Sequence, residues 1–516
     1  MKVFLMQRDS SFESIAKLPA NEAALSQDLE LEVLLGAMAG DDKFLKDVAK
    51  KALLSSLVEV DQILYRQSVL KDCLKNPKVI KDIYKTATET DLGEKGIWGW
   101  YNPYNSVDQL LGRSVKVLRL FTDKLKELRG IVDAHAREFE SEGFKALFAV
   151  LREELSDDYL QSVRDLLSGL EAMDGTLIGA ELGRGNKGTG YALCRQQDKR
   201  QARMGRVFGR SEARQYTFTL DVNDQTGSEM LSELRDRGIN EVANTLAQSS
   251  NHVLGFFNSL RTELAFFVAI LNLREQLTKR GEPTCFPVPL ERGRRAESFA
   301  GLYDPCLALK LEQKVVENDM SAVDKDLVVV TGANRGGKST FLRSIGVARL
   351  LMQCGAFVPA ESFSSDVCAG LYTHFRREED RAMVSGKLDE ELGRMSDIVD
   401  HLSSDCVVLF NESFAATNER EGSEVARQIV TALLERRVRV YFVTHQHELA
   451  GGLYEKKMAN GLFLCAERGP GGERTFKIVQ GEPLETSFGQ DLFDQIFVEA
   501  APAAERKEER ARRETR

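Results

Sequence analysis

The feature that most constrains this chain is a glycine-rich loop between an apolar strand and a helix. The loop follows the apolar run Leu327–Thr331 and precedes the helical segment Thr340–Gln353. Its residues are Gly332, Ala333, Asn334, Arg335, Gly336, Gly337, Lys338 and Ser339. They match the pattern G-x-x-x-x-G-K-[ST], in the order strand, loop and helix that this pattern requires. The sequence therefore predicts a nucleotide-binding loop at the edge of a parallel sheet.

The residue types in this loop predict ATP with Mg²⁺ as the ligand. Glycines allow consecutive backbone N–H groups to face phosphate oxygens, because no side chain obstructs the approach. The positive end of the following helix adds to the attraction. Lys338 is expected to reach the β- and γ-phosphates, and the Ser339 hydroxyl is expected to ligate Mg²⁺.

Two further strand ends carry candidate catalytic residues. The apolar strand Cys406–Phe410 is followed by Asn411 and Glu412. In P-loop ATPases an acidic residue at such a strand end lies near the metal, and another group orients the attacking water. Glu412 suits the second role. Asn411 offers an amide oxygen without charge where Asp is usual, so we expect weaker Mg²⁺ binding and slower hydrolysis. His445 follows the strand Val438–Thr444 and is expected to sense the γ-phosphate.

The pattern of apolar residues predicts an α + α/β fold. In the first three-fifths of the chain, apolar residues recur at three- and four-residue steps, as in amphipathic helices. Helices are predicted over Glu30–Leu74, Val117–Val132, Phe144–Leu170 and Ile239–Leu277. The second and third of these would form an antiparallel arm, joined by the polar turn at residues 141–143. From Leu302 onward, short apolar strands alternate with helices, which is typical of a mainly parallel sheet. Later strands are expected at Phe463–Cys465 and Thr475–Val479.

This pattern divides the chain into three predicted regions. Residues 1–300 are predicted to form an all-helical domain, with a long arm at about 107–171 and a small basic hairpin element inserted at about 183–226. The alternating run Tyr216–Leu220 suggests the hairpin. Residues 301–497 are predicted to form an ABC-type P-loop ATPase domain. Residues 498–516 are mostly charged, so they are expected to be a disordered tail.

Composition narrows the classes of protein to which the chain can belong. Its 516 residues carry a formal net charge of -9, which argues against a uniformly basic surface but allows a local basic patch. The eight cysteines form no Cys-x-x-Cys pair, so a zinc or redox motif is not expected. The sequence shows no signal peptide and no uninterrupted run of about 18 apolar residues. We therefore expect a cytoplasmic protein without a membrane partner.

A basic segment is the candidate contact to nucleic acid. It has seven basic residues between Arg195 and Arg214, against two acidic ones. Such clusters attract phosphate backbones. A run of charged residues that is merely exposed to solvent would have the same composition. We give the two interpretations about equal weight. The candidate DNA-binding residues are Lys187, Arg195, Arg200, Arg203, Arg206 and Arg210.

Several segments, in order, resemble the MutS family of DNA mismatch-repair ATPases. Residues 331–340 resemble its Thr-Gly-Pro-Asn-Met-Gly-Gly-Lys-Ser-Thr loop. The other matching segments are Val315–Asp319 (Val-Pro-Asn-Asp, near the adenine), Phe357–Ala360 (Tyr-Val-Pro-Ala), Thr444–Leu449 (Thr-His-Tyr-His-Glu-Leu) and Ser487–Gly489 (Ser-Tyr-Gly). The resemblance adds Thr340, Val316 and Asn318 to the expected ATP-binding residues. The helical region is similar in layout to the core and lever domains of the family.

The chain also departs from the family pattern. Members that recognise mismatches carry an N-terminal domain with a Phe-x-Glu wedge and then a connector domain, whereas this chain begins in what resembles the core. It is identified as a short, divergent member without those two domains. The Ser-Gly-x-Ser-Thr signature, which meets ATP on the partner subunit, is kept only as Ser385 and Gly386. The resemblance implies a homodimer in which each chain completes the neighbouring site and the helical arm encircles DNA.

Two functions are compatible with these features. The first is an ATP-dependent DNA-binding clamp that acts on mismatched, branched or otherwise irregular DNA in repair or recombination, and that associates with the nucleoid when bound. The second is a nucleotide-dependent conformational switch that assembles with protein or ribosomal partners and hydrolyses little ATP. Asn411 favours the second.

Overall fold

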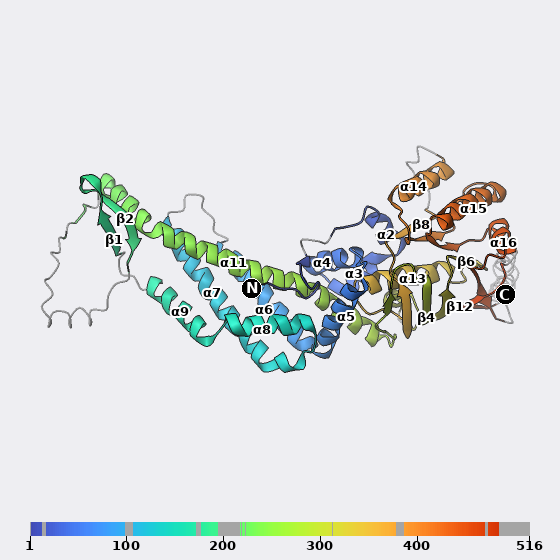
Figure 1. Ribbon diagram of the computed structural model, residues 1–516, viewed down its shortest axis with the longest axis horizontal. Helices are drawn as coiled ribbons and strands as arrows, with labels where there is room; N and C mark the ends of the chain where they lie inside the picture. The colour runs from blue at the N-terminus through green and yellow to red at the C-terminus, as the bar shows by residue number, and fades with distance from the viewer. Residues whose placement is uncertain are drawn as a thin grey trace, which may run out of the picture. The chain divides into compact units, whose positions relative to one another are not determined.

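The computed structural model describes residues 2–12, 17–98, 107–171, 177–194, 217, 219–221, 223–311, 313–377, 386–469 and 473–483. Figure 1 shows the helices and strands along the chain. They group into two compact units, unit 1 (residues 1–4 and 76–264) and unit 2 (residues 5–75 and 265–516). The predicted domains, 1–300 and 301–497, were drawn from the sequence pattern, whereas the two units are defined by contacts in space. The domain boundaries therefore stay a prediction. The predicted tail, 498–516, lies outside the described residues.

Unit 1 is mostly helical, as the spacing of its apolar residues predicts. Its helices are α6 (Pro77–Trp98), α7 (Val107–His135), α8 (Glu142–Glu154), α9 (Asp157–Glu171) and the first part of α11 (Gln225–Lys279). Val117 and Phe121 of α7 are buried in one apolar cluster with Leu167 of α9 and Leu246 of α11. The apolar stripe predicted for the arm is therefore a packing face.

The second helix of the predicted arm is broken into two, so the prediction of one helix over Phe144–Leu170 is wrong. Helix α8 ends at Glu154, and α9 begins at Asp157. Arg129 of α7 donates to the carbonyls of Arg152 (2.9 Å) and Leu155 (2.8 Å), which satisfies acceptors at the end of α8. The Ser156 hydroxyl then accepts the Tyr159 N–H at 3.3 Å, as a helix-starting serine does.

A hairpin of unit 1 begins at Ile178, ahead of the predicted insert at about 183–226, and overlaps the start of that insert. Strand β1 (Ile178–Leu182) pairs antiparallel with β2 (Gly188–Leu193) across a short 3₁₀ turn. Thr217 and Leu220 of the run that suggested the hairpin are in no strand. Gly183 is the turn signal that could have located it, because its N–H donates to the Lys187 carbonyl at 2.8 Å. Most of the predicted insert, including residues 195–216, lies outside the described residues.

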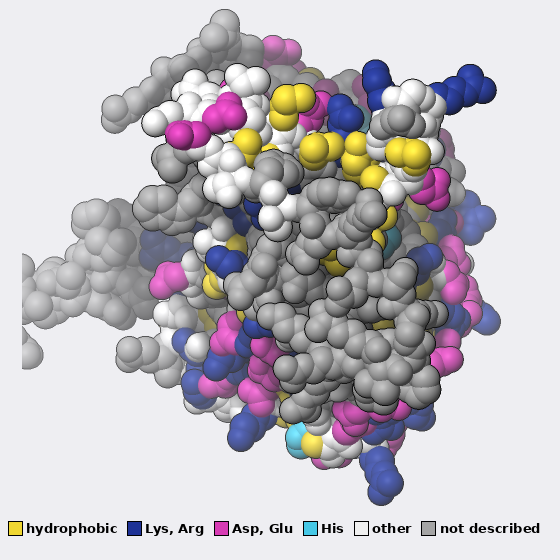
Figure 2. All heavy atoms as spheres, turned by 90° about the vertical axis from the view of Figure 1, so that its left-hand side faces the viewer, with side chains coloured by type: hydrophobic (Ala, Val, Ile, Leu, Met, Phe, Trp, Pro, Cys, Tyr) yellow, Lys and Arg dark blue, Asp and Glu magenta, His cyan; other side chains and the backbone are white. Residues whose placement is uncertain are grey.

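Large apolar side chains are exposed around this hairpin. They include Leu182, which is 79% exposed, and Met230 and Leu231 at the start of α11. Figure 2 looks onto this face and shows hydrophobic side chains among basic and acidic ones. The described part of the face is therefore mixed in character and not uniformly basic.

Unit 2 begins with four short helices, α2 (Glu22–Asp28), α3 (Leu31–Ala39), α4 (Lys43–Leu54) and α5 (Val60–Lys75). The helical prediction for Glu30–Leu74 is confirmed, with breaks that it did not contain. One break follows from Asp42, whose carboxylate accepts the N–H groups of Phe44 and Leu45 and so starts α4.

A six-stranded, mainly parallel sheet forms the centre of unit 2. Its order is β12-β11-β6-β10-β9-β8, and only β12 runs antiparallel to its neighbour. Its strands are β6 (Leu327–Thr331), β8 (Leu371–Phe375), β9 (Val407–Asn411), β10 (Arg439–Val443), β11 (Gly461–Arg468) and β12 (Arg474–Gln480). The middle strands are buried along their length, as apolar runs without alternation predict. The α/β prediction is confirmed here, although β8 was not expected.

A second sheet of four strands also belongs to unit 2, and the sequence did not predict it. Its order is β3-β7-β4-β5, with β3 (Val288–Leu290), β4 (Ala296–Leu302), β5 (Asn318–Val323) and β7 (Ser362–Asp366). These strands are short and partly polar, and β5 alternates strictly between buried and exposed residues. Strand structure therefore begins before Leu302. The helices that accompany the two sheets are α12 (Pro305–Lys310), α13 (Lys338–Gln353), α14 (Lys387–His401), α15 (Glu419–Glu435) and α16 (His447–Glu455).

Among the described residues, helix α11 alone is long and apolar enough to cross a membrane by composition. Its most apolar 18-residue window has a mean hydropathy of 1.4, and 67% of that window is buried inside the structure. A core helix passes the same test, so this is weak evidence for a membrane span.

Candidate functional site

The candidate site lies where four parallel strands of the six-stranded sheet end. Parallel strands β6, β8, β9 and β10 have their carboxyl ends at the same edge, so the residues that follow each strand meet there. The glycine-rich loop follows β6, Glu412 follows β9, and Thr444 and His445 follow β10. The strand–loop–helix order predicted for the loop is confirmed.

The backbone of the loop takes conformations that suit glycine. Gly332 has φ 114° and Gly337 has φ 91°, both in the left-handed region. A Cβ atom on Gly332 would lie 2.9 Å from the Ala466 N atom, and one on Gly336 would lie 2.8 Å from the Ala466 Cβ. Gly337 precedes α13 without a side-chain cap, so the first N–H groups of this helix have no capping acceptor. Such a helix start is suited to binding an anion.

Lys338 is buried against its own loop. Its Nζ donates to the carbonyls of Gly332 (2.9 Å) and Ala333 (3.0 Å). Burial lowers the pKa of Lys338, and the nearby charge of Glu412 opposes that shift. The two carbonyls hold the amine at the mouth of the loop.

Ser339 and Asn411 are brought together as the sequence predicts. The Ser339 hydroxyl donates to the Asn411 Oδ1 at 2.9 Å, from the first turn of α13 to the end of β9. Its Oγ lone pairs are the kind of hard oxygen ligand that Mg²⁺ prefers. Among the described residues no group of three or more His, Cys, Asp or Glu side chains could hold a metal ion. The donor set thus fits a Mg²⁺ ion held mainly by phosphate oxygens, with Ser339 as the protein ligand and no charge from Asn411.

Glu412 and His445 face each other across the same edge. The His445 Nδ1 lies 3.8 Å from the Glu412 Oε1, and the Glu412 N–H donates to the Val443 carbonyl at 2.9 Å. His445 lowers the pKa of Glu412, and the charges of Lys338 and Arg376 act in the same direction against burial. Glu412 is therefore held as a carboxylate near neutral pH, which is the form that can orient or deprotonate water.

A buried histidine that the sequence analysis missed lies behind Glu412. The His374 ring on β8 has its Nδ1 2.7 Å from the Ser413 Oγ and its Nε2 2.9 Å from the Glu391 carbonyl of α14. A carbonyl only accepts, so in the neutral ring Nε2 carries the proton, and the Ser413 hydroxyl also donates to the His374 carbonyl. Burial lowers the pKa of His374 from 6.5 to about 4. No signal pointed to His374, because its strand was itself unpredicted.

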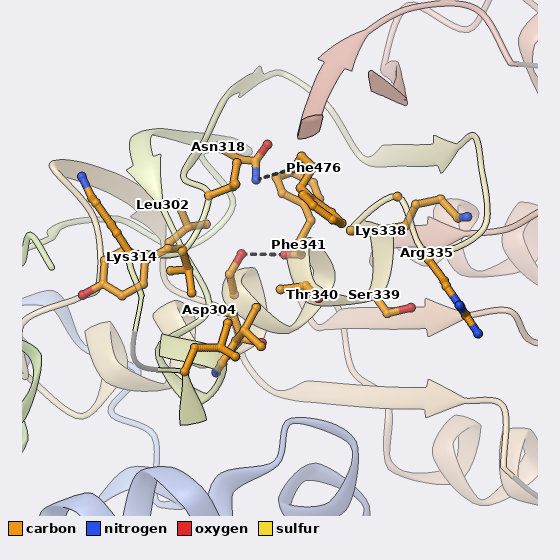
Figure 3. Close-up of a pocket in the computed structure, with 18 of the residues that line it drawn as sticks. Leu302, Asp304, Lys314, Asn318, Arg335, Lys338, Ser339, Thr340, Phe341 and Phe476 are labelled. Carbon is orange, nitrogen blue, oxygen red and sulfur yellow. Dashed lines mark hydrogen bonds between the residues drawn. The ribbon is translucent and has the colours of Figure 1, made fainter. Parts of the chain in front are cut away.

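A cavity of about 400 Å³ opens beside the loop. In Figure 3, Lys338, Ser339 and Arg335 lie on one side of it and Leu302 and Lys314 on the other. Val316 and Asn318, expected near the adenine, line the cavity. Glu412 and Thr340 line it too, whereas Asn334 does not.

Asn318 and Phe476 connect the two sheets at this cavity. Asn318 accepts the Ile478 N–H at 2.7 Å and donates to the Phe476 carbonyl at 3.4 Å, so its amide binds the backbone of β12. The Phe476 ring is 45% exposed and lines the cavity from β12. The sequence analysis missed Phe476, because an isolated aromatic residue in a late strand gives no motif.

Of the other predicted site residues, the structure describes only Gly386 and Lys187. Gly386 precedes α14 with an extended backbone, while Ser385 lies outside the described residues. Lys187 is exposed between the strands of the hairpin. The remaining candidate DNA contacts, Arg195, Arg200, Arg203, Arg206 and Arg210, lie outside the described residues.

Comparison with known proteins points to the same family as the sequence motifs. The family model of the MutS2 N-terminal domain matches residues 58–280, and that of MutS domain V matches residues 328–498. The chain is similar to the DNA mismatch repair protein MutS of Thermus aquaticus, with 33% identity over 178 residues, which is 34% of this chain and 22% of the relative. The corresponding protein of Clostridium botulinum is 30% identical over 133 residues, 25% of this chain and 14% of the relative. The match to that of Leptospira interrogans is 33% over 138 residues, again 25% of this chain and 16% of the relative.

The matched segment thus spans about a fifth or less of the length of these curated relatives. The family model of MutS domain V covers the glycine-rich loop and the strand ends beside it. The two family models together cover both the helical region and the six-stranded sheet. This chain is a member of the MutS family.

Proposed function

We propose that the chain binds and hydrolyses ATP, and that this cycle switches a MutS-type DNA-binding protein. The observation that carries the proposal is the assembly of Lys338, Ser339 and Glu412 around one cavity at the carboxyl edge of a parallel sheet. This is the arrangement by which P-loop proteins position a triphosphate and a water molecule. The names of the relatives, DNA mismatch repair protein MutS, support the DNA part of the proposal.

Each residue then has a defined task in the ATPase step. The loop N–H groups and the start of α13 would bind phosphate oxygens, and the Lys338 amine would exchange its two loop carbonyls for the β- and γ-phosphates. Ser339 would hold Mg²⁺, which supplies charge neutralisation when bound. The Glu412 carboxylate would orient the attacking water, and His445 would keep that carboxylate in place and sense the γ-phosphate.

At the level of assembly, we propose a homodimer in which Ser385 and Gly386 reach the nucleotide of the neighbouring subunit. The helical arm of unit 1 and the basic segment near Lys187 would contact mismatched, branched or otherwise irregular DNA. The family resemblance and the local basic composition support this. We propose a cytoplasmic protein that is associated with the nucleoid when bound to DNA.

The test is steady-state ATP hydrolysis by the full chain with and without duplex, branched and mismatched DNA. We expect DNA to stimulate turnover. The Glu412→Gln variant should keep ATP affinity and lose turnover by about a hundredfold or more, since the water-orienting carboxylate becomes a neutral amide. Turnover that survives in this variant would remove Glu412 from the mechanism.

A second function is favoured by one observation, the uncharged Asn411 beside Ser339. With less charge to hold the metal, the site could act as a switch that binds ATP and assembles with protein or ribosomal partners while hydrolysing little. Tight ATP binding with no turnover, unchanged by any of the DNA substrates, would select this function over the first.

A further inference from the structure

The phosphate end of the cavity has an unusual balance of charge. Ser339 lines this end, and its hydroxyl donates to the amide oxygen of Asn411 at the end of β9, so both side chains at the expected metal position are neutral. Two acidic side chains line the cavity within the described residues, Glu412 and Asp304, and the Asp304 carboxylate is paired with Arg343. A nucleotide triphosphate carries about four negative charges, so the protein must supply positive charge from elsewhere when the metal is weakly held.

Arg335 is the first source of that charge. It lies in the middle of the loop with φ 60°, a left-handed conformation that is uncommon for a residue with a side chain. Its side chain is exposed and lines the cavity on the same side as Lys338 and Ser339 (Figure 3). Within the described residues no hydrogen bond or ion pair engages its guanidinium.

Arg376 is the second source. It directly follows β8, and its N–H donates to the Asn411 carbonyl at 2.9 Å, which fixes its backbone next to the metal position. Its side chain is exposed, and its charge is close enough to lower the pKa of Glu412. The next residue, Arg377, behaves differently, because its guanidinium bonds Gln27 and lies 3.7 Å from the Asp28 carboxylate. No such hydrogen bond or ion pair is seen for Arg376 within the described ranges.

We propose that Arg335 and Arg376 bind the phosphate oxygens of the nucleotide, so that this site holds ATP with little dependence on Mg²⁺. The inference rests on the proposed ATP site and identifies the residues that supply positive charge to the bound triphosphate. Arginine suits the task because its planar guanidinium donates two parallel hydrogen bonds to a phosphate and stays charged at any working pH. Arg376 directly follows β8 and bonds the backbone of the neutral Asn411, and Arg335 lies in the loop that follows β6 and lines the cavity.

The experiment measures the affinity of the full chain for a fluorescent ATP analogue, once with excess Mg²⁺ and once with EDTA. We expect chelation to weaken binding to the wild-type protein by less than about threefold. In the double variant Arg335→Met/Arg376→Met, removal of Mg²⁺ should weaken binding by about thirtyfold or more, because the metal must then replace both guanidinium groups. Affinity in excess Mg²⁺ should fall much less.

Two variants serve as controls. Arg427→Met removes a half-buried arginine of α15 that pairs with Glu424, and it should leave both affinities unchanged. Asn411→Asp adds the missing carboxylate, and it should create a Mg²⁺ dependence of about tenfold or more by repelling the bare triphosphate. Circular dichroism melting of each variant establishes that it is folded.

The outcomes separate this inference from the proposed function. If the wild-type protein binds the analogue with Mg²⁺ but loses it in EDTA, or if the double variant keeps its affinity in EDTA, the role of the two arginines is refuted while the ATP site stands. If no binding occurs under either condition, the proposed function itself fails.

Discussion

The two ends of the cavity differ in how they are built. The phosphate end consists of a contiguous loop and two strand ends, and its key contacts involve backbone groups such as the Gly332 and Ala333 carbonyls. The opposite end is assembled from separate side chains, with Leu302 at the end of β4 and Lys314 in the loop before β5. Binding of phosphate by backbone groups needs glycines at fixed spacing, so it produces a motif in the sequence. Binding by side chains from separate segments produces no such motif. Substitutions at the lining residues test this contrast, and one at His374 tests the buried support behind Glu412.

The largest effect is expected at the phosphate end. Lys338→Ala should weaken ATP binding by about a thousandfold or more, since it removes two or three charge-assisted hydrogen bonds to the β- and γ-phosphates. Lys314→Ala, which removes a lysine from the other end of the cavity, should change affinity by less than about threefold. Isothermal titration calorimetry would compare them. Equal losses in the two variants would show that the cavity has no distinct phosphate end.

The next effect concerns stability and the buried support behind Glu412. The folded protein keeps His374 neutral down to about pH 4, whereas the unfolded chain takes up a proton near pH 6.5. The unfolded state therefore binds more protons between these values, and stability falls as the pH is lowered through this window, by up to about 3 kcal/mol. Above pH 6.5 the histidine adds no pH dependence.

Urea denaturation at pH 7 and pH 4.5 would measure this change. His374→Gln can still form hydrogen bonds but cannot titrate, so its stability should fall by about 2 kcal/mol less than that of the wild-type protein over this range. Parallel losses in both proteins would assign the acid sensitivity to other groups.

The smallest effect is expected at Phe476, which lines the cavity from β12. Phe476→Ala should weaken ATP binding by about tenfold, because an aromatic ring that stacks on a base contributes about 1–3 kcal/mol. Binding of inorganic triphosphate should stay within about twofold, since it has no base to stack. Competition titrations against the fluorescent analogue would measure both. A matching loss for triphosphate would mean that Phe476 supports the loop and not the base.

The sequence predicted the parts of this molecule that depend on local rules. The strand Leu327–Thr331 was located to the residue, and Ser339 and Asn411, both expected near the metal from the P-loop pattern, lie within hydrogen-bond distance. The second sheet was missed because its strands are short, partly polar and paired across long separations, as in the pairing of β4 with β7. The break before Asp157 was missed because Arg129, which caps α8, comes from another helix. His374 could not have been recognised, since its role depends on burial between Ser413 and Glu391.

The amide of Asn318 has a consequence for the exposed rim of the six-stranded sheet. Within the described residues β12 is the last strand on its side, and a rim strand normally offers open N–H and C=O groups to any other extended chain. The Asn318 side chain accepts a hydrogen bond from the Ile478 N–H and donates one to the Phe476 carbonyl. It thereby satisfies two backbone groups of β12, as a neighbouring strand would. Deamidation of Asn318 to aspartate would turn its donor into an acceptor facing that carbonyl. Deamidation of this single residue would thus free backbone groups of β12 that another extended chain could pair with. It would also weaken the attachment of the strand that carries Phe476 to the cavity wall.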